Sequence, residues 1–359
     1  MTETNLHTIP ADAPLSTALA MLNNLSGGAM TLFVHDSAGR ITGSVTDGDV
    51  RRALLAGVSV NDSVSSAMNH DFRFIDGDKD SADAVVEKLR DMRRCGITLV
   101  PVLDSNGKLV EIIDLHKTSN RLPLNAVLMA GGKGERLRPM TLTTPKPLLQ
   151  IEGRAIIDYN IHAMAAAGIT NVSVITRYLA DQLYEHFCRP VAGINVRCLT
   201  ESLVLGTIGG AALALSPSSP NRNTLIMNSD LLTTVSFEDM YLRHIAEKAD
   251  VTVAVINYTL SVPYAILSTD SNDCVTSIEE KPTYTYYANA GIYIFKNEIL
   301  ESMAQDTRTD ATDLIEDVIR RGGKVVCHPV NGTWIDIGSP ADFQRATEMM
   351  RHHRNLSRR

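Results

Sequence analysis

The sequence predicts an α/β protein in which a duplicated small domain precedes a larger domain. Two observations lead to this prediction. In the second part of the chain, short apolar stretches at residues 171–176, 224–227 and 251–256 alternate with helical stretches, as is typical of layered α/β domains. In the first third, one pattern of helix and strands occurs twice. A chain of 359 residues has room for two or three domains of roughly 100–200 residues each.

The composition is that of a globular protein, with 44% hydrophobic and 21% charged residues. The net charge of −7 argues against nucleic acid as the main partner, because binding to phosphate backbones needs a basic face. The first residues carry neither a basic segment nor an apolar segment, and no apolar run approaches the roughly 20 residues that span a bilayer. We therefore expect a cytoplasmic protein without a membrane partner. Its five dispersed cysteines predict reduced, mostly buried thiols rather than disulfides or a zinc site.

The two copies of the repeat start near Thr17 and Ala82, and from their turns onward they align with an offset of about 67–68 residues. Each copy reads as an amphipathic helix, an apolar strand, a turn and a second strand. The turns, at residues 36–39 and 104–107, contain the Asp, Asn and Gly that turn geometry favours. A repeat of this length indicates a duplicated domain rather than a solenoid unit.

These copies resemble a tandem pair of CBS domains over residues 1–122, with repeats at about 10–66 and 67–122. The resemblance implies an adenine nucleotide bound by Thr46 and by Asp49, which follows three residues later. In the second copy Asp114 and Lys117 stand at these positions, so at most one complete site of this type is expected. A pair that only dimerises, or only supports the rest of the protein, remains the alternative.

After a short linker, the strand at residues 126–130 leads into a glycine-rich loop at residues 131–147. Three glycines within four residues allow backbone N–H groups to converge on an anion. The loop is not a Walker A motif, because no Lys-Ser or Lys-Thr follows its last glycine. It is not a dinucleotide fingerprint either, because prolines prevent a helix from following at once. We expect an extended loop that holds phosphates through these residues: Gly131, Gly132, Gly134, Lys133, Arg136, Arg138 and Lys146.

The loop, G-G-x-G-x-R-L-x-P followed by P-K-P, resembles the signature of sugar-1-phosphate nucleotidyltransferases. Four further blocks occur in that family's order: E-x-x-x-L-G-T from Glu201, an apolar strand ending in Asp230, E-K-P from Glu280, and a block containing Asp336. Ser229 replaces the glycine that usually precedes the first aspartate. The resemblance implies a Rossmann-like mixed-sheet nucleotidyltransferase domain over residues 123–359, preceded by the CBS-domain pair.

The resemblance also implies the chemistry. A sugar 1-phosphate would attack the α-phosphorus of a nucleoside triphosphate and release pyrophosphate, with Mg²⁺ held by Asp230 and Asp336. Lys146 would lie near the α-phosphate and Lys281 near the sugar phosphate. Further implied contacts are Arg136, Gly131, Gly132, Gly134, Glu201, Gly206 and Thr207 for the nucleotide, and Glu280, Asn289 and Tyr264 for the sugar. We also expect a homo-oligomer.

Glu201 bears on the choice of base, because an ionised carboxylate only accepts hydrogen bonds and guanine offers two adjacent donors. This favours GTP, unless Glu201 is a solvated residue at the rim of the loop. The combined architecture resembles bacterial glucosamine-1-phosphate guanylyltransferases of nonulosonic acid pathways, which implies GDP-glucosamine as product. A mannose- or heptose-1-phosphate guanylyltransferase and a dTTP- or UTP-using enzyme remain alternatives. From a different class, a non-catalytic, adenylate-sensing regulatory subunit is the rival.

Overall fold

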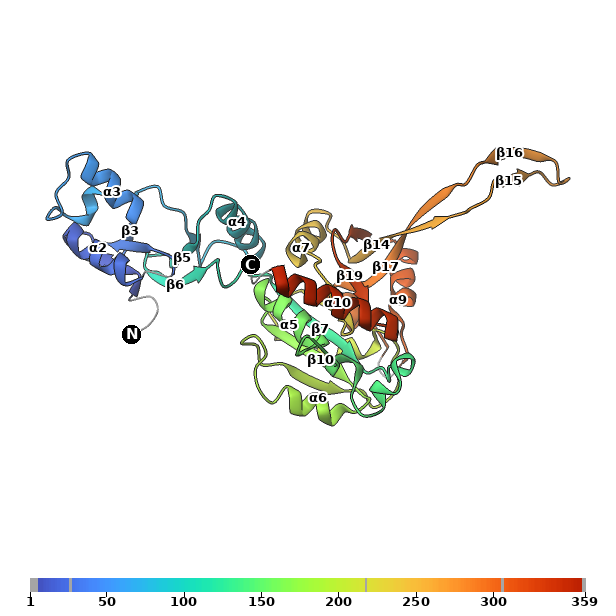
Figure 1. Ribbon diagram of the computed structural model, residues 1–359. Helices are drawn as coiled ribbons and strands as arrows, with labels where there is room; N and C mark the ends of the chain where they lie inside the picture. Colours follow the sequence, from blue (N-terminus) through green and yellow to red (C-terminus); the bar gives the residue numbers. More distant parts are fainter. Residues whose placement is uncertain (1–5, 26–27, 217, 305–306, 357–359) are drawn as a thin grey trace. The chain divides into compact units, whose positions relative to one another are not determined.

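The computed structural model describes residues 6–25, 28–216, 218–304 and 307–356 (Figure 1). The chain forms two compact units. The N-terminal unit comprises Met1–Leu122 with Ala166–Gly168, and the C-terminal unit comprises Pro123–Ala165 and the chain from Ile169 onward. In the described ranges, none of the helices combines the length and the apolar character that crossing a bilayer requires.

The N-terminal unit confirms the predicted repeat of helix and strands. In the first copy, one sheet is formed by β1 (Thr8–Pro10), β2 (Thr31–His35) and β3 (Ile41–Thr46). Helix α2 (Leu15–Asn24) lies between β1 and β2 in the chain, and α3 (Asp47–Leu55) follows β3. In the second copy, β4 (Ile75–Asp76), β5 (Leu99–Leu103) and β6 (Leu109–Asp114) form the corresponding sheet with α4 (Ala82–Arg94). Phe33 and Ile41 of the first copy pack with Leu99 and Leu103 of the second, so the copies share a core.

A seven-stranded mixed sheet organises the C-terminal unit, in the order β11-β10-β7-β12-β17-β14-β18. Its strands are β7 (Leu124–Ala130), β10 (Asn171–Thr176), β11 (Arg197–Thr200), β12 (Asn223–Asn228), β14 (Val251–Ser261), β17 (Thr283–Lys296) and β18 (Val325–Pro329). The four strands β11, β10, β7 and β12 run parallel, whereas β17 pairs antiparallel with both of its neighbours. This arrangement confirms the expected mixed sheet.

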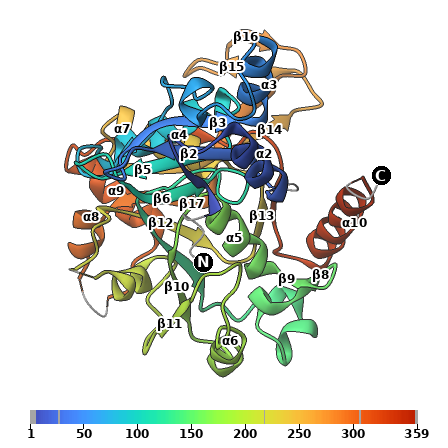
Figure 2. The same ribbon diagram turned by 90° about the vertical axis from the view of Figure 1, so that its left-hand side faces the viewer.

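Helices cover both faces of this sheet, because alternate residues of the strands point to opposite sides. Val127, Ile226 and Val253 face a core that includes residues of α8 (Asn297–Glu301) and α9 (Ala311–Arg320). The opposite face is covered by α5 (Ile156–Ala166) and α7 (Phe237–Ala246). Figure 2 shows α8 and α9 on one side of β12 and α5 on the other. Two further helices, α6 (Ala180–His186) and α10 (Pro340–Leu356), complete the unit.

Strands β14 and β17 continue beyond the sheet as a two-stranded ribbon, which ends in the hairpin of β15 (Ile266–Thr269) and β16 (Val275–Glu279). We call residues 257–287 the arm. Figure 1 shows it projecting from the rest of the C-terminal unit. Its strands pair without interruption from Val255–Asn289 to Ser261–Thr283.

Two expectations need correction. The loop after β7 is not extended: it folds into three 3₁₀ turns, Glu135–Leu137, Met140–Leu142 and Lys146–Leu148. Pro139 and Pro145 each precede one of these turns, where the fixed φ of proline and its missing N–H are tolerated. The cysteines are free, as expected, but four of the five are exposed and only Cys198 is partly buried.

A buried histidine joins α7 to the sheet. His244 is 1% exposed; its Nδ1 lies 2.8 Å from Thr252 Oγ1 and its Nε2 lies 3.2 Å from Asn223 Oδ1. Burial, reinforced by the charge of Lys296, lowers the pKa of His244 to about 4. The imidazole is therefore neutral in the folded protein at neutral pH.

This burial predicts acid sensitivity. The unfolded chain takes up a proton at His244 below about pH 6.5, whereas the folded chain does so only near pH 4. Stability should therefore fall as the pH drops from 6.5 towards 4, by about 2 kcal/mol between pH 7 and pH 5 for this group. Urea unfolding of the wild type and of His244→Gln, at pH 7 and at pH 5, measures this change in stability. The variant should be less stable at pH 7 and lose less on acidification. Replacing the exposed His352 with Gln serves as the control, and an equal pH effect in His244→Gln and the wild type would contradict the assignment.

Candidate active site

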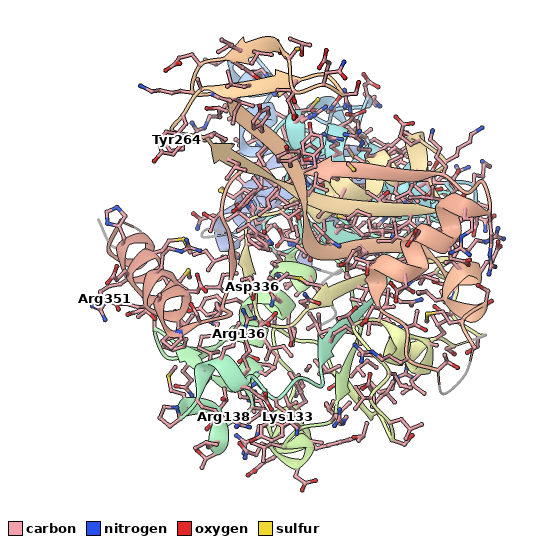
Figure 3. All side chains as sticks on the ribbon, turned by 90° about the vertical axis from the view of Figure 1, so that its right-hand side faces the viewer. Lys133, Arg136, Arg138, Tyr264, Asp336 and Arg351 are labelled. Atoms are coloured by element: carbon pink, nitrogen blue, oxygen red, sulfur yellow. The ribbon has the colours of Figure 1, made fainter. Side chains whose placement is uncertain are left out.

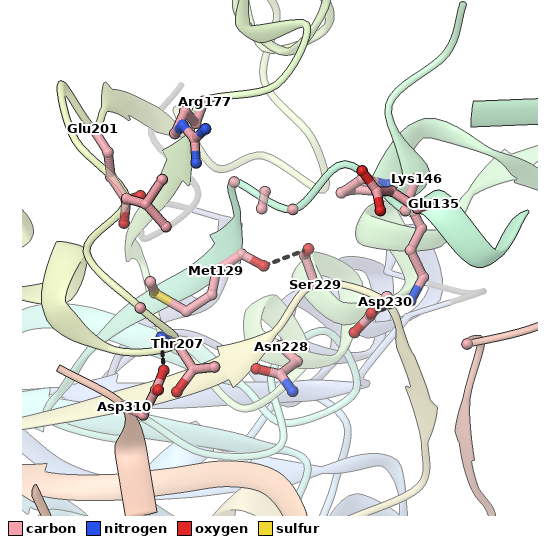
Figure 4. A pocket seen from close by; sticks show the side chains of 18 of the residues that line it. Met129, Glu135, Lys146, Arg177, Glu201, Thr207, Asn228, Ser229, Asp230 and Asp310 are labelled. Atoms are coloured by element: carbon pink, nitrogen blue, oxygen red, sulfur yellow. Dashed lines mark hydrogen bonds and ion pairs between the residues drawn. The ribbon is translucent and has the colours of Figure 1, made fainter. Parts of the chain in front are cut away.

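The site lies where the order of the sheet reverses. The chain runs from β7 to β10 and β11 on one side, and then returns to place β12 on the other side of β7. Ligands of open α/β sheets bind at such a switch point, beyond the carboxyl ends of the strands. A pocket of about 590 Å³ opens there (Figure 4). Its lining includes Gly131, Gly132, Gly134, Arg136, Lys146, Arg177, Glu201, Gly206, Thr207, Asn228, Ser229, Asp230, Arg308 and Asp310.

The glycine loop follows β7 directly and is closed by a buried threonine. Thr141 Oγ1 donates a hydrogen bond of 2.8 Å to the carbonyl of Gly134. Gly134 has a φ of +61°, and a Cβ there would lie 3.0 Å from Thr141 Cγ2 and 3.1 Å from Lys146 Cβ. A side chain at this position would thus be strained and crowded, which explains the third glycine. Lys146 follows in the last turn of the loop, and its side chain is only 12% exposed.

A short ladder brings the two aspartates together. Asp230 lies between β12 and β13 (Leu231–Thr233), and Asp336 ends β19 (Trp334–Asp336). Strands β13 and β19 pair antiparallel with Leu231 opposite Asp336, and Ile337 N donates a 3.1 Å hydrogen bond to Asp230 O. Lys146 Nζ donates to Asp230 Oδ2 and lies 3.8 Å from Asp336 Oδ1. Asp230 and Asp336, more than 100 positions apart in the sequence, thereby form one cluster with Lys146.

The carboxylates have oxygens that suit a cation. Asp230 Oδ1 and Asp336 Oδ1 are both buried, and neither has a hydrogen-bond partner among the described residues. Burial and then the negative charge of Asp230 raise the pKa of Asp336, while Lys146 and Arg136 oppose this shift. Buried polar atoms are normally hydrogen-bonded, so two buried carboxylate oxygens without a hydrogen-bond partner fit the hard-oxygen ligands of Mg²⁺. In the described ranges no group of three or more His, Cys, Asp or Glu side chains suits a metal ion.

Glu201 lies at the other end of the pocket and is 7% exposed, which excludes the solvated rim residue considered above. Its backbone N–H donates to Thr176 O at 3.0 Å, which fixes it beside the end of β10. A Cβ on Gly210 would lie 2.2 Å from Glu201 Oε1, so the carboxylate packs against a glycine backbone. Burial raises the pKa of Glu201, and this effect is larger than the opposing effects of the hydrogen bond from the N–H of Leu205 and of the positive charge of Arg177.

Gly206 and Thr207 are engaged by the start of α9. Thr207 N donates to Asp310 Oδ1 at 2.9 Å, and Thr207 Oγ1 accepts from Ala311 N at 2.8 Å. Gly206 has a φ of +83°, and a Cβ there would lie 2.5 Å from Thr309 O. The backbone N–H of Thr207 therefore donates to the protein, and its hydroxyl oxygen accepts from the protein. Arg308 Nη2 lies 3.2 Å from Asp310 Oδ2 at the same wall.

The expected sugar contacts are not brought into the pocket. Tyr264, Glu280 and Lys281 lie on the arm, with side chains 75%, 71% and 68% exposed. Figure 3 shows Tyr264 well separated from Arg136 and Asp336. Asn289 lies at the base of the arm, where its Oδ1 accepts a 2.9 Å hydrogen bond from Gly291 N. The roles of these four residues stay predictions.

The expected adenylate contacts in the N-terminal unit bond to each other. Thr46 and Asp49 form a capping box at the start of α3, with Thr46 Oγ1 2.6 Å from Asp49 Oδ2, and Arg52 pairs with Asp49 at 2.5 Å. A cavity of about 310 Å³ lies instead beside Asp114 and Lys117, the corresponding positions of the second copy. His7, Thr118 and Arg121 add polar groups to its apolar lining.

Sequence reasoning missed Arg177, Asn228, Arg308 and Asp310, which all line the pocket. Two of them had a usable signal: Arg177 follows β10 directly and Asn228 ends β12, at the edge of the sheet where ligands bind. Arg308 and Asp310 come from a loop that follows α8 and precedes α9. Nothing in their spacing indicates that they reach the turn at Gly206.

Comparisons with known proteins agree with this geometry. A sequence model of the family described as nucleotidyl transferase matches residues 125–353, and one of the CBS domain matches residues 1–56. The chain is 29% identical to a mannose-1-phosphate guanylyltransferase catalytic subunit beta of Dictyostelium discoideum, covering 61% of this chain and 62% of the relative. It is 29% identical to a mannose-1-phosphate guanylyltransferase of Mycobacterium tuberculosis, covering 62% and 64%. The chain thus spans less than two thirds of the length of these relatives.

A solved structure from Bacillus anthracis, described as a glucose-1-phosphate thymidylyltransferase, shows the same fold. It is 21% identical, has a TM-score of 0.50, and the match covers 63% of this chain and 94% of that one. The N-terminal CBS match and the larger match over residues 125–353 agree with the two kinds of unit in the structure. Because the larger match covers more than half of its residues, the chain belongs to the nucleotidyl transferase family.

Proposed function

We propose that the chain transfers a nucleoside monophosphate from a nucleoside triphosphate, GTP in our proposal, to a sugar 1-phosphate. The observation that carries the proposal is the pocket itself. One cavity joins a glycine loop, a nearly buried lysine and Asp230, and the same lysine pairs with the adjacent Asp336. Each aspartate has one buried oxygen without a hydrogen-bond partner among the described residues. The names of the relatives support the same class of reaction. A regulatory subunit without activity has less support, because this pocket retains its cations and Asp230, and Asp336 lies beside Lys146.

In the reaction, an oxygen of the sugar phosphate forms a bond to the α-phosphorus, and the bond from that phosphorus to the bridging oxygen of pyrophosphate breaks. The attacking phosphate is already ionised, so no residue needs to remove a proton. Catalysis then depends on placing two anions together and neutralising their charge. Lys146, Arg136 and the N–H groups of the glycine loop provide positive charge and hydrogen-bond donors on one wall.

Asp230 and Asp336 would hold Mg²⁺, which when bound neutralises charge on phosphate oxygens. Their buried oxygens without a hydrogen-bond partner among the described residues fit this role. Lys146 balances part of the carboxylate charge, because its ammonium group lies between the two aspartates.

Guanine is the base that suits Glu201. Its N1–H and N2–H₂ groups can both donate to a buried carboxylate, whereas adenine presents an acceptor at N1. For the sugar 1-phosphate, there are two candidates. Glucosamine 1-phosphate follows from the architecture that the chain resembles, and mannose 1-phosphate follows from the names of the relatives.

Pyrophosphate release, measured for four nucleoside triphosphates against a panel of sugar 1-phosphates, tests the proposal. The wild type should prefer GTP over UTP, dTTP and ATP by roughly 100-fold or more, because the wrong base leaves a buried acceptor unpaired. Glu201→Gln should lose turnover with GTP, so that the difference between its turnover with GTP and with UTP becomes smaller. Glu135→Gln is the matched control, since this glutamate also lines the pocket but is 63% exposed. Equal nucleotide ratios in the wild type and Glu201→Gln would show that another residue selects the base. No release with any pair would refute the activity.

Asp230→Asn and Asp336→Asn should each lower turnover by roughly 100-fold or more at saturating Mg²⁺, because each removes a charged metal ligand. Without Mg²⁺, Asp336→Asn should melt at the same or a higher temperature than the wild type, because the substitution relieves repulsion between the carboxylates. Added Mg²⁺ should raise the melting temperature of the wild type more than that of either variant. Asp181→Asn, at an exposed position on α6, is the control. Near-normal turnover in either variant would refute the metal assignment.

We also propose that the N-terminal unit binds an adenine nucleotide. Calorimetry with AMP, ADP and ATP tests this with the wild type, Asp49→Ala and Lys117→Ala. Weaker binding in Asp49→Ala alone would support the Thr46–Asp49 site. Loss in Lys117→Ala alone would place the nucleotide in the cavity of the second copy. Asp49→Ala also removes the cap of α3, at about 1 kcal/mol, so circular dichroism must confirm that it folds. No heat with any nucleotide would favour a structural role.

A further inference from the structure

Arg177 is a cation of the pocket whose side chain has no hydrogen-bond or ion-pair partner among the described residues. It follows β10 directly and is partly buried. Arg308, another arginine of the lining, differs because it pairs with Asp310 at 3.2 Å. A guanidinium carries five N–H donors and no acceptor. A partly buried guanidinium with these donors free therefore suits a ligand that accepts hydrogen bonds.

The parallel ladder of β10 and β11 places Arg177 beside Glu201. Thr176 and Thr200 are opposite each other at the end of this ladder, and Arg177 and Glu201 are the residues that follow them. The strand ends are tied together: Thr176 Oγ1 lies 2.9 Å from Thr200 Oγ1, and the N–H of Glu201 donates to the carbonyl of Thr176 at 3.0 Å. Because neighbouring strands are about 4.8 Å apart, the carboxylate and the guanidinium start from adjacent positions.

Both side chains border the first glycine of the loop. A Cβ on Gly131 would lie 3.5 Å from Arg177 Cβ and 3.5 Å from Glu201 Oε2. The positive charge of Arg177 is also close enough to oppose the rise in the pKa of Glu201. Figure 4 shows the two residues on one side of the pocket, away from Lys146 and Asp230. A ligand held at this end therefore meets a hydrogen-bond acceptor and a cationic donor close together.

Guanine has an edge that matches this pair. Its two donors, N2–H₂ and N1–H, are followed by the acceptor O6, and the acceptor N7 comes next. In the proposed function, Glu201 accepts from the two donors. An arginine that donates to O6 and N7 makes the commonest specific contact of proteins with guanine. Adenine presents the donor N6–H₂ in place of O6, so an arginine at this position disfavours adenine.

We infer that Arg177 is a second base-selecting residue, whose guanidinium donates to O6 and N7 of guanine while Glu201 accepts from N1–H and N2–H₂. The inference rests on the proposed function, in which the substrate is GTP. Arg177 adds to the rejection of adenine. Uracil and thymine keep an acceptor at the position that corresponds to O6, so Glu201 alone must reject these two bases.

Analogues of GTP that lack a single group test the inference. Calorimetry without a sugar phosphate measures the binding of GTP, of 7-deaza-GTP, which lacks the N7 acceptor, and of ITP, which lacks the 2-amino group. The wild type should bind 7-deaza-GTP roughly 5-fold or more weakly than GTP, because one donor of Arg177 then loses its acceptor. Arg177→Met should bind GTP and 7-deaza-GTP equally, yet still bind ITP more weakly than GTP, because Glu201 is intact.

Equal binding of GTP and 7-deaza-GTP by the wild type would overturn the inference. So would an Arg177→Met protein that binds all three nucleotides more weakly by one common factor, because the cation would then contact phosphates or only support the fold. Circular dichroism checks that Arg177→Met folds. Arg177→Lys is a second variant and should retain part of the preference for GTP over 7-deaza-GTP, since lysine can also donate to O6 and N7.

Arg308→Met is the matched control, since it also removes a cation of the lining, and it should keep the wild-type preference for GTP over 7-deaza-GTP. These measurements separate failure of the inference from failure of the proposed function. Tight binding of GTP that depends on neither Arg177 nor N7 would overturn the inference alone. A lack of pyrophosphate release despite the expected binding ratios would refute the proposed reaction alone. No binding of GTP by the wild type would overturn both.

Discussion

The short ladder between β13 and β19 is the constraint on which the site depends. It holds only three pairs, yet it fixes Asp336 beside Leu231 and hence beside Asp230. Like charges so close repel each other, and burial increases the repulsion. Lys146 makes the arrangement tolerable by placing its ammonium group between them. The glycine loop is therefore anchored to the carboxylates at one end and to β7 at the other.

The sheet explains why these parts meet. Four parallel strands end at one edge, and the strand order reverses at β7, where ligands of such sheets bind beyond the carboxyl ends of the strands. Ser229 strengthens this edge, since its hydroxyl donates a 2.6 Å hydrogen bond to the carbonyl of Met129 at the end of β7. A glycine could not make that bond. The serine thus adds a cross-strand link beside the aspartate while leaving the direction of the chain unchanged.

Much of the fold could be predicted because it is encoded locally. Apolar runs bounded by turn residues indicated β10, β12 and the start of β14, and the glycine loop and both aspartates were identified from motif and order. The 3₁₀ turns of the loop were not predicted, because proline excludes a regular helix but does not exclude a single turn. Asp310 escaped prediction because it reaches Thr207 only through a tertiary contact, and Arg308 because it joins this wall only through its ion pair with Asp310. The exposure of the arm escaped it too, since the strand pattern shows which residues share a face but not what covers that face.

The packing of Glu201 has a consequence for how this family can diversify. Its carboxylate is held against Gly210, and it also lies 3.5 Å from where a Cβ on Gly131 would be. The residue proposed to select the base therefore lies close to the loop proposed to hold the phosphates. A larger side chain at position 201 would push on the first glycine of that loop, and any side chain at position 210 would displace Glu201. Base preference and phosphate binding should consequently change together during evolution. A redesign that alters the base preference will also require substitutions in the phosphate-binding loop.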